Sequence, residues 1–236
     1  MKTINRRTAL AATAAAALIP GAARAQAWPN KPIKVLQGFA AGGNADTIAR
    51  LVGTEMAKGL GQPFVVEAVV GAGGTLASAA VARAAPDGHT LLLATGGHAV
   101  AGALYEKLPY QTVNGFQMVS TITYFPFLVV TTAESRYRSL TEVLAAARAQ
   151  ANAISYGTAG VGSTHHLVGE LMAKMAGVQM LHVPYRGDSA SLTSLLAGDI
   201  PIIIAPPTAV LGNLKAGKLR ALAVTGPKRW AGMPEV

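Results

Sequence analysis

The chain has 236 residues, of which 51% are hydrophobic and 13% are charged, and its formal net charge is +9. This length is enough for one large domain or two modest ones. The sequence contains no cysteine, which excludes disulfides and thiolate metal sites. Aromatic residues make up only 6% of the chain, so the core must be built mostly from Ala, Val, Leu and Ile.

Residues 1–25 have the pattern of an export signal. A basic start precedes an Ala-rich apolar run, and Ala23, Arg24 and Ala25 form a small-residue cleavage motif. The apolar run is too short to span a bilayer of roughly 30 Å, which argues against a membrane anchor. Arg6 and Arg7 suggest the twin-arginine route, although a Sec signal can also carry two arginines. We therefore expect the mature protein in the periplasm.

Removing the signal lowers the net charge, because the signal contains four basic residues and no acid: Lys2, Arg6, Arg7 and Arg24. Of the 20 basic residues 16 remain, against 11 acidic ones, so the mature chain carries +5. These basic residues are scattered and have no aromatic platform beside them. Nucleic-acid binding is thus not supported.

Short apolar runs alternate with helical patterns along the rest of the chain. Strands are predicted at 33–37, 64–70, 89–95, 118–124, 127–132, 153–158, 180–185, 199–205 and 219–225. Helices are predicted at 44–60, 75–85, 98–108, 139–150, 163–177, 188–198 and 207–217. This order predicts an α/β fold with parallel strands joined by crossover helices. The consecutive strands 118–124 and 127–132 break the alternation and suggest a crossing between two domains.

Helix positions give two further expectations. In the helix 44–60, Ile48, Leu51, Val52 and Met56 share one face, which we expect to be buried. The helix 139–150 begins with Ser139 followed three residues later by Glu142, the spacing of a capping box.

The stretch FAAGGNAD, residues 39–46, joins a strand to a helix through two glycines. Gly42 and Gly43 allow a sharp turn and a close approach of the backbone to a ligand. The following amides, at 44–46, are unsatisfied donors at the positive end of a helix, where carboxylate, sulfate or phosphate groups bind. The alternative is a tight turn with no ligand, because glycine serves any such turn.

The same arrangement recurs at 158–166 and at 95–99. All three loops follow parallel strands, and open α/β sheets bind ligands at the carboxyl ends of such strands. A cleft between two lobes with helix ends on both sides would hold an anionic ligand. Asp188, after the predicted strand at 180–185, is expected to cap the next helix.

Nucleotide-binding motifs fit poorly. The chain has no phosphate-loop motif ending in Lys and Ser or Thr. GAGGTL, residues 71–76, resembles a dinucleotide fingerprint but places Leu76 where close helix packing needs Gly or Ala, and GVGSTH, residues 160–165, places His165 there.

Catalytic and metal-binding patterns are also weak. Ser163 lies outside any G-x-S-x-G elbow. His165 and His166 point about 100° apart on a helix, so they cannot share a metal ion as an i, i+4 pair could. We find no set of nucleophile, base and orienting group, and we expect neither a cofactor nor a metal.

Several segments together resemble one known family. NKPIKVLQGFAAGGNADTIAR, GAGGTLASAAVARAAPDGHTLLL, TAGVGSTHHLVGELMAKMAGV, LHVPYRG and AGKLRALAVTGPKRW are similar to the substrate-binding proteins of tripartite tricarboxylate transporters, the Bug receptors. The resemblance runs from about Trp28 to the last residue. Of these segments, HVPYRG followed by AGKLRALAVT is the most specific.

The resemblance implies a two-lobed periplasmic-binding-protein fold of type II that delivers a small carboxylate to membrane permease subunits. It implies a first lobe of residues 26–125 and 226–236 and a second lobe of 126–225, with hinges near 124–128 and 225–227. Backbone amides of loops from both lobes would hold the carboxylate. The residues expected at the ligand site are Phe39, Ala40, Gly42, Gly43, Asn44, Asp46, Gly97, His98, Ala99, Gly160, Gly162, Ser163, Thr164, His165, Asp188, Pro207 and Thr208.

The chain departs from the family pattern in three places. Ala41 replaces a proline before the glycines, and Ala68, Val69 and Val70 replace a polar run. Family members also continue beyond Val236, so we expect the sequence to be a fragment. Two alternative hypotheses for the function are an exported hydrolase that uses Ser163 and a sensory subunit with the same cleft. We expect a monomeric receptor and not an enzyme.

Overall fold

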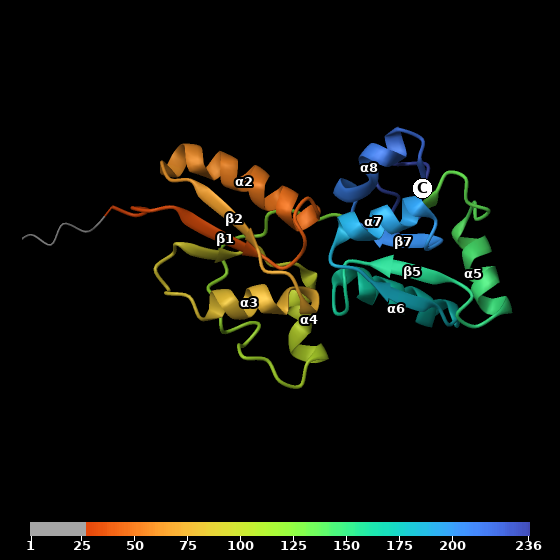
Figure 1. The fold of residues 1–236 in the computed structure, drawn as a ribbon, viewed down its shortest axis with the longest axis horizontal. Helices are drawn as coiled ribbons and strands as arrows, with labels where there is room; N and C mark the ends of the chain where they lie inside the picture. The colour runs from red at the N-terminus through yellow and green to blue at the C-terminus, as the bar shows by residue number, and fades with distance from the viewer. Residues whose placement is uncertain (1–26) are drawn as a thin grey trace, which may run out of the picture.

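The computed structural model describes residues 27–236; the predicted export signal lies outside the described residues. Two α/β parts lie side by side along the longest axis (Figure 1). The part built on a three-stranded sheet is called the first lobe, and the part built on a five-stranded sheet the second lobe. This two-lobed α/β arrangement confirms the predicted fold class.

The first lobe contains a parallel sheet with the order β2-β1-β3. Its strands are β1 (Ile33–Gln37), β2 (Phe64–Ala68) and β3 (Thr90–Leu92). Its helices are α2 (Asn44–Leu60), the short 3₁₀ turn η1 (Ala72–Gly74), α3 (Thr75–Ala82) and α4 (Gly96–Leu104). Helix α2 covers one face of the sheet and α3 the other (Figure 1).

Helix α2 has the predicted bounds but not the predicted buried face. Leu51 and Met56 are 65% and 39% exposed, whereas Ala45, Ala49 and Gly53 are buried. A Cβ added at Gly53 would lie 2.8 Å from the Cβ of Phe64, so only a small residue allows this close approach to the sheet. The expectation was wrong because close packing selected the small residues rather than the large apolar ones.

The second lobe contains a mixed sheet with the order β6-β5-β7-β4-β8. Its strands are β4 (Leu128–Thr132), β5 (Ser155–Thr158), β6 (Leu181–Pro184), β7 (Ile202–Ala205) and β8 (Leu219–Val224). Its helices are α5 (Leu140–Ala149), α6 (Thr164–Ala176), α7 (Asp188–Ala197) and α8 (Pro207–Lys215). Strand β4 is antiparallel to β7 and β8, so the expectation of parallel strands holds for the rest of the sheets only.

The core of the second lobe lies on both faces of β7. Ile202 and Ile204 pack into a cluster with α5 residues, and Ile203 and Ala205 pack into a cluster with residues of α7 and α8. Adjacent strand residues point to opposite faces, so four consecutive apolar residues fit a strand covered on both sides.

The predicted strand at 118–124 does not form. This segment is irregular and exposes Met118, Val119 and Tyr124, and no strand pairs with it within residues 27–236. An apolar pattern cannot produce a strand without a neighbouring strand to supply hydrogen bonds.

The final segment also differs from the expectation. It was assigned to the first lobe, but Met233 packs against the core of the second lobe, and the C-terminal end lies there (Figure 1). Burial of the Met233 side chain against apolar neighbours accounts for this position.

Helix α5 begins at the predicted cap. The Glu142 amide donates to Ser139 Oγ over 3.2 Å. The Glu142 carboxylate accepts from the amide of Arg138, one residue before the position that a capping box uses.

Candidate functional site

The two lobes meet along a surface that we call the seam, where Ala40, Asn44, Gly73 and Gly97 of the first lobe contact Gly162, Arg186, Asp188 and Thr208 of the second. Five helices begin directly after strands and point their N-terminal ends at this seam. Helices α2 and α4 follow β1 and β3 in the first lobe, and α6, α7 and α8 follow β5, β6 and β7 in the second. A helix N-terminus carries a partial positive charge and free amide donors. The seam therefore collects positive helix ends from both lobes.

Direct contacts join α2 to the second lobe. The Asn44 amide donates to Asp188 Oδ2 over 3.0 Å, and the Thr208 hydroxyl donates to Asn44 Oδ1. Just before α2, the Ala40 amide donates to the carbonyl of Arg186 over 3.0 Å. The predicted loop 39–46 thus meets the predicted second-lobe turns.

A second set of contacts joins the glycine-rich loops 71–74 and 95–99 of the first lobe to the start of α6. A Cβ on Gly97 would lie 3.0 Å from the Gly162 carbonyl oxygen, and a Cβ on Gly73 would lie 2.7 Å from that of Val161. Residues 71–74 all have positive φ, and Ala72 (φ 45°) is the one residue of the four that is not glycine. Sequence reasoning missed Gly73 as a seam residue; the run GAGG was its only signal, because so many glycines permit close backbone approach.

Asp188 does not cap its own helix, which corrects the expectation. Gly187 occupies the N-cap position of α7 without a side-chain cap, and Asp188 directs its carboxylate across the seam to α2. Burial alone would raise the pKa of Asp188, but contacts with His165 and the Asn44 amide outweigh it and lower the pKa. The N-terminus of α2 thus binds a carboxylate of the protein itself. The binding of a ligand carboxylate by this loop stays a prediction.

Asp46 shows the same preference of this loop for carboxylates. Its Oδ2 accepts the Gly42 amide over 3.1 Å, and Arg50, one turn further along α2, binds both carboxylate oxygens. The Arg50 guanidinium, helped by the Gly42 amide, outweighs burial and lowers the pKa of Asp46. Asp46 is therefore already neutralised within the first lobe.

Two predicted site residues have all their polar atoms engaged elsewhere. His98 Nε2 donates to the carbonyl of Thr112 over 2.9 Å, which leaves Nδ1 to accept from the Ser78 hydroxyl. Ser163 donates from Oγ to the Gly160 carbonyl and caps α6 by accepting the His166 amide. No histidine ring nitrogen contacts Ser163 Oγ within the described residues, so the hydrolase reading gains no support from this geometry.

The remaining predicted residues fall on and around the seam. Phe39 is buried with Ala45 and with Ala159 of the second lobe, and Ala99 is exposed on α4. Thr164 faces Gly96, whose added Cβ would lie 2.8 Å from the threonine hydroxyl. Pro207 is buried at the first position of α8.

Comparison with known proteins gives the family. Residues 48–236 match the profile of the tripartite tricarboxylate transporter family receptor. The chain belongs to this family. Over 236 residues the receptor is also 39% identical to the UPF0065 protein in the tcbD-tcbE intergenic region of Pseudomonas sp. (strain P51), covering 99% of this chain and 70% of that protein. The family resemblance found in the sequence is thereby confirmed.

Solved structures support the same conclusion. The receptor resembles the periplasmic binding protein BugD with a TM-score of 0.84 and 31% identity, over 89% of this chain and 70% of that one. It resembles MatC of Rhodopseudomonas palustris, solved with bound malate, with a TM-score of 0.82 and 34% identity, over 89% and 71% of the two chains. The two-lobed binding-protein fold is thus established for the receptor.

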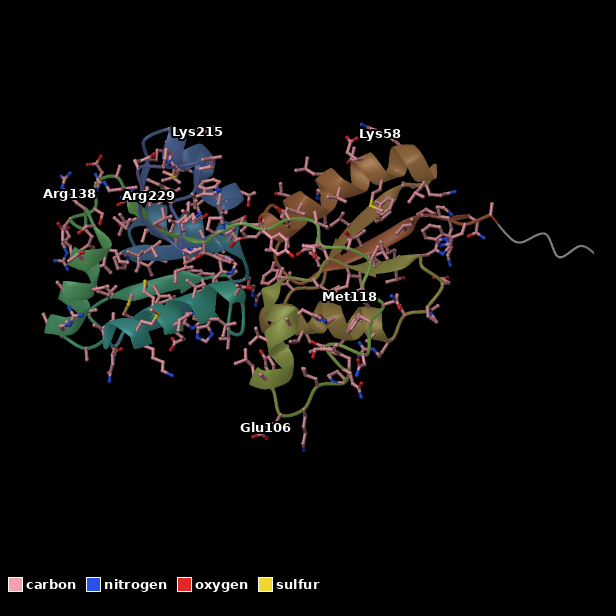
Figure 2. The ribbon with its side chains drawn as sticks, turned by 180° about the vertical axis from the view of Figure 1, so that it is seen from behind. Lys58, Glu106, Met118, Arg138, Lys215 and Arg229 are labelled. Carbon is pink, nitrogen blue, oxygen red and sulfur yellow. The ribbon has the colours of Figure 1, made fainter. Side chains whose placement is uncertain are left out.

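The described residues contain no cluster of three metal-ligating side chains and no helix long and apolar enough to cross a membrane. The labelled basic residues are spread over both lobes, with Lys58 far from Arg138, Lys215 and Arg229 (Figure 2).

Two hollows are lined by residues of the first lobe. One of about 320 Å³ is lined by residues between Gly102 and Asn114, and one of about 10 Å³ lies between Phe39, Gly73 and His98. At the seam the lobes touch directly, so ligand entry requires the contacts between them to open.

Two stacked histidines, His166 on α6 and His182 on β6, make the stability of the protein depend on pH. The rings of His166 and His182 stack with centroids 3.9 Å apart, and His166 Nδ1 accepts the amide of Gly162 in the seam loop. Burial and the neighbouring His166 lower the pKa of His182 to about 4, against an opposing effect of Glu170.

We expect the stability of the receptor to fall as the pH drops from about 6.5 to about 4. Within that window the unfolded chain binds a proton at His182 that the folded chain does not, so acid favours unfolding. The variant His182→Gln should show a shallower loss of urea midpoint between pH 7 and 4. If the urea midpoint fell equally with pH in the variant and the unmodified protein, His182 would not be responsible for the acid destabilisation.

Proposed function

We propose that the protein is a periplasmic solute receptor that binds a small organic carboxylate between its lobes and delivers it to the permease of a tripartite tricarboxylate-type transporter. The observation that carries this proposal is the seam itself, where the N-termini of α2, α4, α6, α7 and α8 gather and where the N-terminus of α2 already holds the Asp188 carboxylate. Helix N-termini hold carboxylates through amides, which explains a site without an arginine clamp.

Binding would proceed by closure of one lobe on the other. The chain crosses between lobes in the irregular segment before β4, where the Phe127 amide donates to Thr225 Oγ1 and its carbonyl accepts the Thr225 amide. We place the hinge at this crossing, which the contacts of Phe127 with Thr225 anchor to the second lobe. Contacts such as those of Ala40 and Asn44 exist only when the lobes touch, and a ligand favours closure through contacts of that kind.

The relatives favour a carboxylate ligand. MatC, with which this chain shares 34% identity, was solved with malate. Export to the periplasm through the signal at 1–25, by the twin-arginine or the Sec route, places the receptor where such a ligand is collected. We propose that it acts as a monomer and is not an enzyme.

A thermal-shift screen against about a hundred organic acids tests the proposal. A ligand at about a hundredfold excess over its dissociation constant stabilises the folded state by roughly 2.7 kcal/mol, which raises the melting temperature by several degrees. We expect one chemical class of carboxylates to give this shift, and phosphates, sulfates and uncharged analogues to give none. A cooperative melt that no carboxylate shifts would contradict the proposal.

A further inference from the structure

The seam contains a buried polar pair whose hydrogen bonds are incomplete. The side chains of Asp188 and His165 are only 6% and 9% exposed. His165 Nε2 stands 2.7 Å from Asp188 Oδ1 and forms an ion pair with it when His165 is protonated, but the two atoms make no aligned hydrogen bond. Among residues 27–236, Asp188 Oδ1 and both ring nitrogens of His165 therefore have no aligned partner.

Asp188 consequently has acceptor capacity to spare. An ionised carboxylate can accept about four hydrogen bonds, and Asp188 uses one of these for the Asn44 amide. A buried charge with an unfilled acceptor position is costly, so a donor aligned with Oδ1 would be bound strongly. The lowered pKa of Asp188 keeps the group ionised at neutral pH.

The position of Asp188 also affects any ligand carboxylate at the start of α2. Oδ2 of Asp188 would lie 3.3 Å from a Cβ on Gly43, so a second carboxylate at this helix end would stand next to the first. Like charges at such a distance repel each other in a buried site. The other acid nearby, Asp46, is paired with Arg50 and adds little to this repulsion. The Phe127 ring packs edge-on against His165, with ring centroids 4.7 Å apart.

We infer that Asp188 makes the receptor select carboxylates that carry a hydrogen-bond donor, a hydroxyl or an ammonium group, on the carbon next to the carboxylate. The ligand carboxylate would bind the helix amides, and the neighbouring donor would reach Asp188 Oδ1 and offset the repulsion. This inference rests on the proposed function, because it concerns the ligand class of the same site.

Matched sets of acids test the selection in the unmodified protein. Each set contains a plain acid, its 2-hydroxy derivative and its 2-amino derivative: propionate, lactate and alanine; succinate, malate and aspartate; glutarate, 2-hydroxyglutarate and glutamate. Titration calorimetry should show that at least one donor-bearing acid binds about ten- to a hundredfold tighter than the plain acid of its set, the range expected for a hydrogen bond to a charged group. Whichever derivative binds more tightly identifies the preferred donor as a hydroxyl or an ammonium group.

The variant Asp188→Asn tests whether Asp188 causes the selection. In this variant the dissociation constants of the three acids of a set should lie within about threefold of one another, because the plain acid is no longer repelled and the donor loses its charged partner. Glu134→Gln is the matched control: it removes one negative charge from an exposed position of the same lobe and should preserve the selection.

The outcomes separate the inference from the proposed function. Plain acids that bind as tightly as their derivatives would overturn the inference and leave the carboxylate receptor standing. Selection that persists in Asp188→Asn would overturn the role of Asp188. If the variant fails to melt cooperatively, the comparison within the unmodified protein decides alone. Failure of all nine acids and of the wider acid screen would overturn both.

Discussion

Replacing Gly73 with alanine should weaken carboxylate binding by about ten- to a hundredfold while leaving unfolding cooperative. The new Cβ would lie 2.7 Å from the Val161 carbonyl oxygen and 2.9 Å from the carbonyl carbon of Gly162, both backbone atoms of the other lobe. Overpacking of this kind costs about 1–3 kcal/mol, and the cost falls on the closed arrangement alone, because the clash disappears when the lobes separate. The measurement is the dissociation constant of the best acid by titration calorimetry.

Gly61→Ala is the matched control. Gly61 has a φ of 68°, close to the 62° of Gly73, but nothing lies within 4 Å of its added Cβ. Both variants therefore carry the strain of alanine in the left-handed region, and only Gly73→Ala carries the clash between lobes. Equal affinities in the two variants would contradict a closure in which η1 meets the start of α6.

Replacing Ile203 with alanine should lower the free energy of unfolding by about 2–5 kcal/mol. Ile203 is fully buried on the central strand β7, where it packs with Leu195 of α7 and Val210 of α8. Truncation removes apolar contacts and leaves a cavity that the rigid sheet cannot close.

Leu181→Ala provides the comparison, because Leu181 lies on the edge strand β6 of the same sheet and is 52% exposed. In chemical denaturation, Leu181→Ala should lower the free energy of unfolding by much less than Ile203→Ala does. Similar losses at both positions would show that the second lobe is not built around β7.

Local patterns predicted most elements of the fold. The helix α2 and the strand β1 have the predicted bounds because their signals lie within a few residues: a short apolar run in the strand, a glycine pair before the helix and Gly61 after it. The segment 118–124 carried an equally good strand pattern and formed none. Pairing is a property of two segments, and one segment cannot reveal whether its partner is present.

The sequence suggested the chemistry that we propose for the site but could not suggest its contacts. The loop 39–46 was predicted to hold a carboxylate because helix ends and glycines are visible in sequence. That the carboxylate in the structure belongs to Asp188, 144 residues away from Asn44, depends on how the lobes meet. A cap at the start of its own helix was the nearest role for Asp188 that local pattern could suggest.

Calorimetric titration of the tightest-binding acid beside its own primary amide tests the central claim most directly. The two molecules have nearly the same shape, and only the acid offers an anion to the helix ends of the seam. The account predicts that the acid binds and that the amide binds at least a hundredfold more weakly, a difference of about 2.7 kcal/mol. Equal binding of acid and amide would show that the seam does not recognise a carboxylate.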